Sequence, residues 1–561
     1  MYSNKENVNI LTSLLTTYGI QSVVVCPGSR NAPLVHNFNE CKLLQCVPVT
    51  DERSAGFYAL GIAQATKRPV AVCVTSGSAL LNVAPAVAEA TYQRNGIIVI
   101  SADRPACWID QQDGQTLPQP GAFGRLVEKS VSLPEPHTPE ERWHCARLVK
   151  EALTTAFSEA RPSVHINVPI SEPLFEFDVT QLPEERPIRN VRLERKVYDA
   201  TSLIFEKKVC HPMIVIGQDC RLHEYKMPYL EYVKERMVVL YEPLFDKDAP
   251  VFDRLLQRIA NEEKWQPDVV FYTGGTLVSK RLKKFLRNLP AHVPMIEFSI
   301  DGKPHDTFQH LRAIVKADAV CGLQAVADLW ERHHEEWIAD DNEVQAYYKR
   351  WQIAMDAERR HIAAFVPAFS QMMAVKLLED FLNSNTYNYC IHYANSTAIR
   401  LACIYSRRHV LCNRGVNGIE GSLSAAAGFS VGFLQHTICV IGDLSFFYDQ
   451  NALWNVNLDG KLHILLLNNG CGSIFKGLHG LETSAVADTF VAGQHHTSAH
   501  GICQENHIHY MAATNAGELA DGIEWLCDRK GERPRLLEVF TNADTDTREL
   551  KRYYEEDNQN R

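Results

Sequence analysis

The chain has 561 residues, of which 45% are hydrophobic and 22% are charged. This is the composition of a globular protein, and the length exceeds what one core accommodates, so about two to four domains are expected. The formal net charge of −10 argues against a general binder of nucleic acid or of an anionic membrane surface. An anionic ligand must therefore be met by a local cluster of Arg and Lys side chains.

Hydropathy and cysteine usage indicate where the protein works. No apolar run approaches the ~20 residues of a membrane-spanning helix, and the N-terminal stretch is polar and then amphipathic, without a secretory pattern. The sixteen cysteines are scattered and form no C-x-x-C pair, which is typical of reduced thiols packed as small apolar residues. We therefore expect a cytoplasmic protein that binds no membrane.

The first part of the chain alternates apolar strands with helices. Strands are expected at 22–26, 70–75, 96–101 and 163–168, and helices at 7–18, 54–65, 80–92 and 138–158. Continuous apolar strands separated by helices predict a doubly wound parallel sheet. Residues 169–195, rich in Pro and charge, are predicted to be a linker.

The pattern then repeats twice. A second group of strands is expected at 212–216, 237–241, 269–273 and 294–299, followed by a charged helical connection over 329–360. A third group is expected at 389–393, 437–441, 462–468 and 535–540. We therefore predict an α/β protein of three doubly wound domains with parallel sheets, over 1–185, 195–335 and 360–561. Such folds bind ligands at the carboxyl ends of strands and at domain seams.

An acidic group stands between an expected strand and an expected helix. The apolar run ends at Val49, Asp51-Glu52-Arg53 follows, and a small-residue helical pattern begins at Ser54. Acidic residues commonly stabilise the start of a helix through its dipole. The pattern alone leaves open whether Glu52 has this structural role or a chemical one.

A second pair of polar residues lies in the third group. Gly442-Asp443 ends one strand, and Asn468-Asn469 ends the next, one strand-helix-strand crossover later. Their oxygens can therefore meet at one edge of a parallel sheet, where two oxygen donors and a backbone carbonyl suit Mg²⁺ holding phosphate oxygens. The alternative is that Asp443 and Asn469 only cap two loops.

This spacing resembles the diphosphate-binding motif of thiamine diphosphate-dependent enzymes. In that family a Glu at a strand end of the N-terminal domain hydrogen-bonds N1′ of the aminopyrimidine, so the resemblance gives Glu52 a catalytic role. It also implies the thiamine diphosphate-binding fold, with the pyrimidine end of the cofactor on the first block and the diphosphate end on the third. The metal, Mg²⁺ or Mn²⁺, would be held by Asp443, Asn469 and residue Cys471, the last through its backbone carbonyl.

Smaller motifs narrow the family. The chain resembles the 2-succinyl-5-enolpyruvyl-6-hydroxy-3-cyclohexene-1-carboxylate (SEPHCHC) synthases of menaquinone biosynthesis, from about residue 19 to residue 542. The segments that carry this resemblance are VVCPGSRNAPL, SADRPACWIDQQDGQTLPQPGAF, SKRL, ANSTAIRL, NRGVNGIEGSLSAAAG and GDLSFFYDQNAL. The family decarboxylates 2-oxoglutarate and joins the product to isochorismate. Because each substrate carries two carboxylates, Arg is the suitable residue to bind them.

The resemblance implies a role for each matching residue. Ser396, Arg400 and Arg414 are expected on the 2-oxoglutarate side as catalytic residues, with Ser396 and Arg400 on one helical face. Isochorismate is expected to be bound by Ser29, Arg30, Arg104, Lys280 and Arg281, below an apolar wall of Ile474 and Phe475. Cofactor contacts are expected from Gln115, Asn395, Ser396, Gly418, Ile419, Gly442, Leu444 and Ser445, with Ile419 bending the cofactor.

Other interpretations of these residues stay open. Each Arg could be an ordinary surface charge, and Ile474 and Phe475 could be core residues. Gly114 departs from the Asn expected before Gln115 in some relatives. The His-rich segment 495–509 matches no standard zinc spacing, so a loop beside the active site is favoured over a metal site.

Two rival functions remain. One is another thiamine diphosphate-dependent 2-oxoacid decarboxylase or an acetolactate synthase-like enzyme. FAD is not expected, because no G-x-G-x-x-G follows a strand in the central block. The other rival is a regulatory protein that has kept the fold, but Glu52, Asp443 and Asn469 are all present. The family also builds each cofactor site from two subunits, which implies a homodimer or homotetramer.

Overall fold

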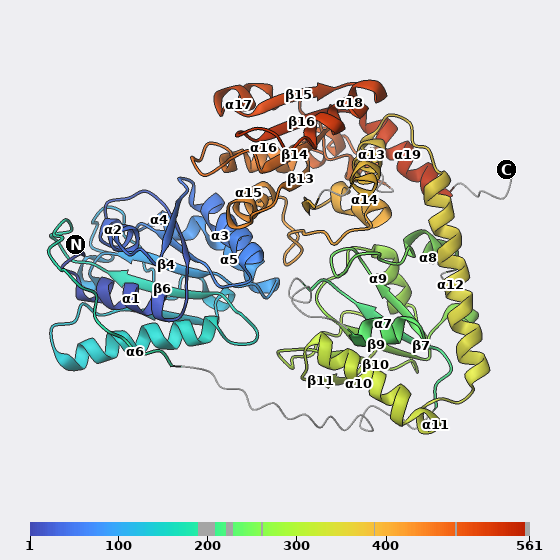
Figure 1. Ribbon diagram of the computed structural model, residues 1–561, viewed down its shortest axis with the longest axis horizontal. Helices are drawn as coiled ribbons and strands as arrows, with labels where there is room; N and C mark the ends of the chain where they lie inside the picture. Colours follow the sequence, from blue (N-terminus) through green and yellow to red (C-terminus); the bar gives the residue numbers. More distant parts are fainter. Residues whose placement is uncertain (189–207, 220–227, 260–261, 386–387, 477–479, 556–561) are drawn as a thin grey trace.

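The computed structural model describes residues 1–188, 208–219, 228–259, 262–385, 388–476 and 480–555. Within them lie three parallel sheets, each with its own helices (Figure 1). None of the helices in this part of the chain combines the length and the apolar character that crossing a membrane requires. The predicted α/β class with three parallel sheets is confirmed.

The first sheet is six-stranded, in the order β2-β1-β3-β4-β6-β5. Alternate residues of a strand point to opposite faces, so Val23 and Val25 pack with the first and last helices of the unit, and Val24 packs with the two on the other face. The sheet is therefore doubly wound. Its elements are α1 (Glu6–Thr17), β1 (Ser22–Val25), α2 (Ala32–Glu40), β2 (Gln45–Pro48), α3 (Glu52–Thr66), β3 (Ala71–Val74), α4 (Ser78–Asn82), α5 (Ala84–Tyr92), β4 (Ile98–Asp103), β5 (Lys129–Ser132), α6 (Pro139–Ala156) and β6 (Val164–Pro169).

The second sheet is five-stranded, in the order β11-β10-β9-β7-β8. Val269 and Phe271 of its central strand face one core, and Val270 and Tyr272 face another. Its elements are β7 (Pro212–Ile216), α7 (Pro228–Lys234), β8 (Val238–Tyr241), α8 (Asp253–Ile259), β9 (Val269–Thr273), α9 (Lys280–Arg287), β10 (Met295–Phe298), β11 (Leu311–Val315), α10 (Ala319–Arg332) and α11 (His334–Trp337). The predicted charged connection forms α11 and the long helix α12 (Asp341–Ala364), which runs along the outside of the second unit up to the third.

The third sheet is also five-stranded, in the order β12-β13-β14-β16-β15. Ile438 and Val440 face one core, while Cys439 and Ile441 face the core shared with the first unit. Its elements are α13 (Gln371–Ser384), β12 (Cys390–Tyr393), α14 (Thr397–Tyr405), α15 (Ser422–Gly432), β13 (Thr437–Gly442), α16 (Asp443–Tyr448), β14 (Leu462–Asn468), α17 (His500–Glu505), β15 (His509–Ala513), α18 (Ala516–Leu526), β16 (Arg535–Phe540) and α19 (Ala543–Glu555).

Two local predictions were wrong. The helix expected over 80–92 is divided into α4 and α5, and α5 starts with a proline, Pro85, in its first turn, where the missing N–H is tolerated. The expected linker is not free of the first unit: the Tyr2 N–H donates to the Val179 carbonyl at 2.6 Å, and Leu174 is buried. Its last residues, 189–195, lie outside the described residues.

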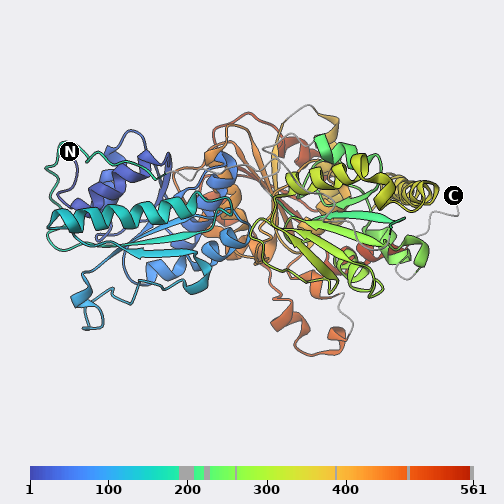
Figure 2. The ribbon, with the colours of Figure 1, turned by 90° about the horizontal axis from the view of Figure 1, so that it is seen from below.

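The first and third units meet along α3 and α15, which lie side by side (Figures 1 and 2). A Cβ on Gly61 would stand 2.0 Å from the carbonyl oxygen of Ala425, and one on Gly428 would stand 2.3 Å from that of Tyr58. The two helix backbones therefore touch, which only glycine allows. This contact fixes the sheet that carries Glu52 against the sheet that carries Asp443.

Candidate active site

The residues around Glu52 separate the two interpretations left open above. Asp51 is the N-cap of α3, and its carboxylate accepts a hydrogen bond from the Ser54 N–H at 2.8 Å. The half-buried Glu52 carboxylate accepts one from the Asn82 side chain at 3.1 Å. The capping role therefore belongs to Asp51, and Glu52 is left for another purpose.

Several predicted residues gather at the carboxyl edge of the first sheet. Ser29 and Arg30 follow β1, Glu52 follows β2 and Arg104 follows β4. Because the strands are parallel, these positions share one edge. The exposed Gln115 reaches the same edge, since its backbone carbonyl would lie 3.2 Å from a Cβ on Gly77, the residue that precedes α4.

The two arginines of this edge are each paired with a carboxylate of the protein. Arg30 is buried and contacts Glu172 at 2.9 Å, and Arg104 contacts Asp113 at 2.8 Å. Glu172 is 69% exposed and Asp113 is 36% exposed. Both arginines of this edge therefore already bind a carboxylate of the protein. Because Glu172 and Asp113 are exposed, a ligand carboxylate can take their place.

At the third sheet, Asp443 follows β13 and Asn469 follows β14, as the motif requires. The buried Asp443 carboxylate accepts hydrogen bonds from the N–H groups of Leu444 at 2.7 Å, Asn469 at 3.1 Å and Gly470 at 2.8 Å. Burial raises the pKa of this carboxyl group, while these N–H donors oppose the rise. The Asn469 amide donates to Asp546 of α19 at 2.7 Å. This hydrogen bond fixes the orientation of the Asn469 amide and therefore the direction in which its Oδ1 atom points.

These residues fit a diphosphate with a hard divalent cation. A Cβ on Gly442 would meet no atom within 4 Å, so space is open beyond the end of β13. Within the described residues, the buried Nε2 of His495 makes no hydrogen bond, although it lies 3.5 Å from Asp443 Oδ2. Burial raises the pKa of the Cys471 thiol. The backbone carbonyl of residue 471 is the donor that suits a hard cation, since Mg²⁺ takes oxygen ligands.

The segments after β12 and before α15 are tied together by one side chain. The amide of Asn395 donates to the Gly418 carbonyl at 2.7 Å, and its oxygen accepts from Arg414 at 3.1 Å. The neighbouring Ile419 is 43% exposed, and its carbonyl accepts the hydroxyl of Ser445. Asn395, Arg414, Gly418, Ile419 and Ser445 therefore form one surface beside Asp443 and the adjoining Leu444.

Ser396 departs from the expectation that it shares a helical face with Arg400. It precedes α14 as the N-cap, with φ of 73°, and the helix begins at Thr397. A positive φ is costly for a residue with a side chain and is found where surrounding structure enforces it. The strained backbone turns Ser396 out of the helix.

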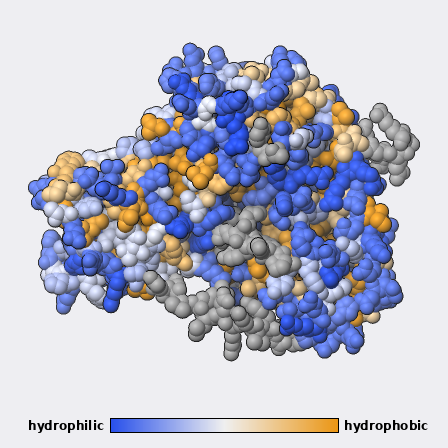
Figure 3. Space-filling view, in the orientation of Figure 1, coloured by the Kyte–Doolittle hydropathy of each residue, from blue (hydrophilic) through white to orange (hydrophobic). Residues whose placement is uncertain are grey.

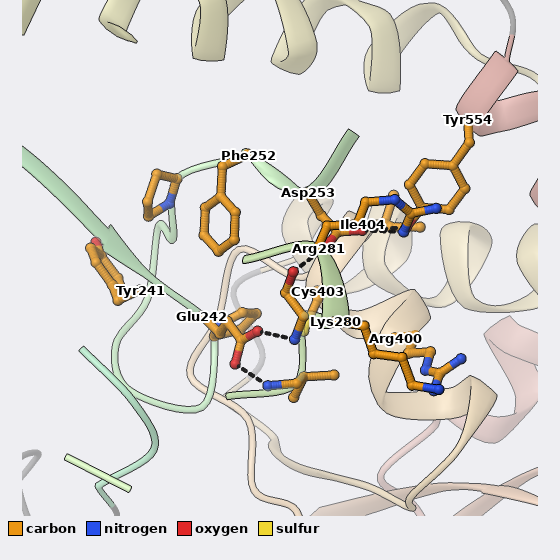
Figure 4. A pocket seen from close by; sticks show the side chains of 14 residues that line it. Tyr241, Glu242, Phe252, Asp253, Lys280, Arg281, Arg400, Cys403, Ile404 and Tyr554 are labelled. Carbon is orange, nitrogen blue, oxygen red and sulfur yellow. Dashed lines mark hydrogen bonds and ion pairs between the residues drawn. The ribbon is translucent and has the colours of Figure 1, made fainter. Parts of the chain in front are cut away.

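Lys280, Arg281 and Arg400 line one cavity of about 90 Å³ between the second and third units (Figure 4). Ser279 caps α9 by accepting the Leu282 N–H at 2.9 Å, and the buried Glu242 accepts the N–H groups of Val278 and Ser279, both at 2.7 Å. Burial lowers the pKa of Arg400, and the nearby Arg414 acts in the same direction. Residues far apart in the sequence thus form a cationic cavity.

Ile474 and Phe475 lie in a short 3-10 helix, Ser473–Phe475, and both are partly buried. The His-rich segment is dispersed: His495 lies at Asp443, His500 starts α17 and His509 starts β15. Among the residues that the structure describes, no three His, Cys, Asp or Glu side chains group to hold a metal.

Sequence reasoning missed the partners of these side chains. Carboxylates face three of the arginines, an amide faces Glu52, and further side chains support Asn469 and the start of α9. Most of them lie far along the chain from the residue that they contact, so no local motif joins the two; Asp113, which follows Arg104 within the segment SADRPACWIDQQDGQTLPQPGAF, is the exception. They are Asn82, Asp113, Glu172, Glu242, Asp253, Asp546 and Tyr554.

Comparison with known proteins agrees with this geometry. Residues 6–121 match a family described as thiamine pyrophosphate enzyme, N-terminal TPP binding domain. Together with the paired sheet edges, this match defines the class: a thiamine diphosphate-dependent enzyme.

Full-length relatives define the family. The chain is 41% identical over 580 residues to the 2-succinyl-5-enolpyruvyl-6-hydroxy-3-cyclohexene-1-carboxylate synthase of Bacteroides thetaiotaomicron, covering 99% of each chain. It is 39% identical over 577 residues to that of Phocaeicola vulgatus, again with 99% of each covered. For Porphyromonas gingivalis the identity is 32% over 569 residues, covering 99% of this chain and 97% of the relative. The chain belongs to the SEPHCHC synthase family, whose reaction is of the transferase type.

Proposed function

We propose that the protein decarboxylates 2-oxoglutarate and joins the remaining succinyl unit to isochorismate, giving SEPHCHC and CO₂ in cytoplasmic menaquinone biosynthesis. The observation that carries this proposal is the cavity in which Lys280, Arg281 and Arg400 meet. Two dicarboxylate substrates need several cations near one point, and an acidic chain supplies them only where folding gathers them.

Each part of the chain has a share in this reaction. Residues 1–185 would bind the pyrimidine end of thiamine diphosphate through Glu52 and Gln115, and residues 360–561 would bind its diphosphate through Asp443, Asn469 and a Mg²⁺ or Mn²⁺ ion. The central residues 195–335 would contribute substrate cations. When bound, the cofactor supplies the electron sink that lets a 2-oxo acid lose CO₂ and form a new carbon–carbon bond.

The protein's own groups then hold protons and charges in place. Glu52 would accept a hydrogen bond from the cofactor's pyrimidine and so set its tautomer. Arg400, Arg414 and Ser396 would bind the carboxylate ends of 2-oxoglutarate, and Ser29, Arg30, Arg104, Lys280 and Arg281 would bind isochorismate. Ile474 and Phe475 would exclude water from the isochorismate ring.

We also propose a homodimer, or a tetramer of such dimers. Large apolar side chains remain exposed on both units that would hold the cofactor. Figure 3 also shows hydrophobic surface where these two units meet. Contiguous exposed apolar surface is typical of subunit interfaces. These side chains include Leu81, Val416, Ile419, Tyr448, Trp454 and Val456.

One experiment tests the proposed reaction. The protein is incubated with thiamine diphosphate, Mg²⁺ and 2-oxoglutarate, with and without isochorismate, and the products are identified by mass spectrometry. We expect SEPHCHC only when both substrates and the cofactor are present. A product from 2-oxoglutarate that is the same with and without isochorismate would show a simple decarboxylase instead.

A further inference from the structure

Two side chains with no assigned part in the reaction wall the cavity that holds Lys280, Arg281 and Arg400. Asp253 begins α8 in the second unit, and Tyr554 lies near the end of α19 in the third. Figure 4 shows both beside the Arg281 guanidinium group, with Lys280 and Arg400 nearby.

Arg281 is held on three sides. Its Nη1 donates to Asp253 Oδ2 at 2.8 Å, its Nε donates to Gln257 at 3.1 Å, and its guanidinium carbon lies 3.7 Å from the centre of the Tyr554 ring. The Tyr554 hydroxyl donates to the same Oδ2 atom at 2.7 Å. The carboxylate and the aromatic ring therefore act on Arg281 as one unit.

The second oxygen of Asp253 connects this unit to the start of α9. Oδ1 of Asp253 accepts the hydroxyl of Ser279, which itself accepts the Leu282 N–H as the helix cap. A single carboxylate thus orients both the backbone from which Lys280 and Arg281 project and the end of the Arg281 side chain. A free Arg side chain loses rotamer freedom when a ligand fixes it, and this arrangement meets that entropic cost before a ligand binds.

Asp253 differs from the carboxylates that face the other arginines. It is 24% exposed, against 36% for Asp113 and 69% for Glu172, and the ring of Tyr554 covers the guanidinium group. A ligand carboxylate can displace Glu172 more readily than it can displace a group with three hydrogen-bonding partners. Asp253 is therefore suited to remain in place when substrate enters.

We propose that Asp253 and Tyr554 are positioning residues that fix Arg281 for a substrate carboxylate. The inference rests on the proposed function, in which Arg281 binds isochorismate. It makes the C-terminal helix part of the active site: Asp546, in the first turn of α19, holds Asn469, and Tyr554, in its last turn, holds Arg281.

The test compares Asp253→Asn, Tyr554→Leu and Tyr554→Phe with the parent enzyme. We expect the KM for isochorismate to rise roughly tenfold in Asp253→Asn and Tyr554→Leu, with kcat nearly unchanged, because a pre-set binding group is lost. Tyr554→Phe keeps the ring below Arg281 and is expected to recover most of the affinity. The KM for 2-oxoglutarate, and the slow CO₂ release from it without isochorismate, are expected to stay at the parent level.

Asp356→Asn is the matched control, because Asp356 pairs with Arg359 at 3.1 Å on α12, outside the residues that line the cavity. It is expected to leave both KM values unchanged. An isochorismate KM at the parent level in all three variants overturns the proposal. A parallel rise in both KM values with loss of CO₂ release also overturns it, since that pattern shows general damage. A parent enzyme that forms no SEPHCHC contradicts the proposed function instead.

Discussion

Asp51 and Glu52 are adjacent acids with different partners, and the difference separates structure from chemistry. Asp51 satisfies the Ser54 N–H and also accepts from Asn451 at 2.9 Å, which joins the first unit to the third. Among the residues that the structure describes, the Glu52 carboxylate accepts one hydrogen bond, from the Asn82 side chain. A carboxylate that the fold uses so little is free to serve a ligand.

We expect Glu52→Gln to reduce activity about 10²–10⁴-fold, the range that a positioned acid–base group contributes. The amide keeps the size of the side chain but cannot stabilise a protonated pyrimidine. Exchange of the thiamine C2 proton, followed by NMR after acid quench, should slow in parallel while the cofactor still binds.

Asp51→Ala is the control for this experiment. It removes the helix cap and is expected to lower the unfolding free energy by about 1 kcal/mol, with C2 exchange preserved. Normal exchange in Glu52→Gln would return that residue to a structural role.

At the scale of secondary structure, burial decided which elements could be predicted. The strands missing from the prediction, β5, β11 and β15, all lie at sheet edges. Their side chains alternate or are largely exposed, as in Leu311–Val315, so no continuous apolar run marks them. Central strands such as Pro212–Ile216 and Leu462–Asn468 are buried on both faces and match the predicted bounds.

The residues of the candidate site also fall into two groups, those that the sequence could predict and those that it could not. Residues within local motifs, such as Asp443 after a strand, could be assigned from sequence. The partners of those residues could not, because a hydrogen bond such as Tyr554 to Asp253 joins positions 301 residues apart. Only the folded chain brings these partners together, so their spacing in the sequence does not predict the contact.

The α3–α15 contact yields a prediction about packing. Gly61→Ala would place a methyl group on the Ala425 backbone, which cannot move without separating the helices. We expect the unfolding free energy, measured with urea, to fall by about 1–3 kcal/mol. Gly501→Ala, in α17 with no atom within 4 Å of the added Cβ, is the control and is expected to be neutral or slightly stabilising. Equal stability of both variants would show that this contact adapts.

Strand β12 carries a buried histidine that makes stability depend on pH. Burial lowers the pKa of His392 to about 3 from its usual 6.5. Below pH 6.5 the unfolded chain takes up a proton that the folded chain refuses. Stability from this group is therefore present above that pH and is lost, by about 1.4 kcal/mol per pH unit, as the pH falls toward 3.

We expect the His392→Leu variant to lack this pH-dependent loss of stability. Between about pH 7 and pH 5.5 the thermal midpoint of the parent should fall more than that of the variant, by the equivalent of about 1 kcal/mol. His137→Leu replaces an exposed histidine and should keep the parent's pH dependence. The same fall in the parent and in His392→Leu would mean that His392 binds its proton equally well in the folded and the unfolded chain.

At the scale of the whole molecule, Glu52 and Asp443, which represent the two halves of the cofactor site, have their hydrogen-bonding partners in different units of the chain. Glu52 bonds to Asn82 of the first unit, while the partners of Asp443 all lie in the third. Among the described residues, no hydrogen bond or ion pair links Glu52 with the Asp443 group. A second copy of the chain can bring the missing half to each side, as the proposed homodimer requires.

Mixing two inactive variants tests this arrangement. Glu52→Gln disables the pyrimidine half and Asp443→Ala disables the metal half, so each variant alone is expected to be inactive. If sites are shared between subunits, a mixed dimer contains one site with both changes and one with neither. After subunit exchange, verified by native mass spectrometry, we expect about a quarter of the parent activity, because about half of the dimers are mixed. If each site lies within one chain, every site in a mixed dimer carries one change, and activity stays absent despite proven exchange.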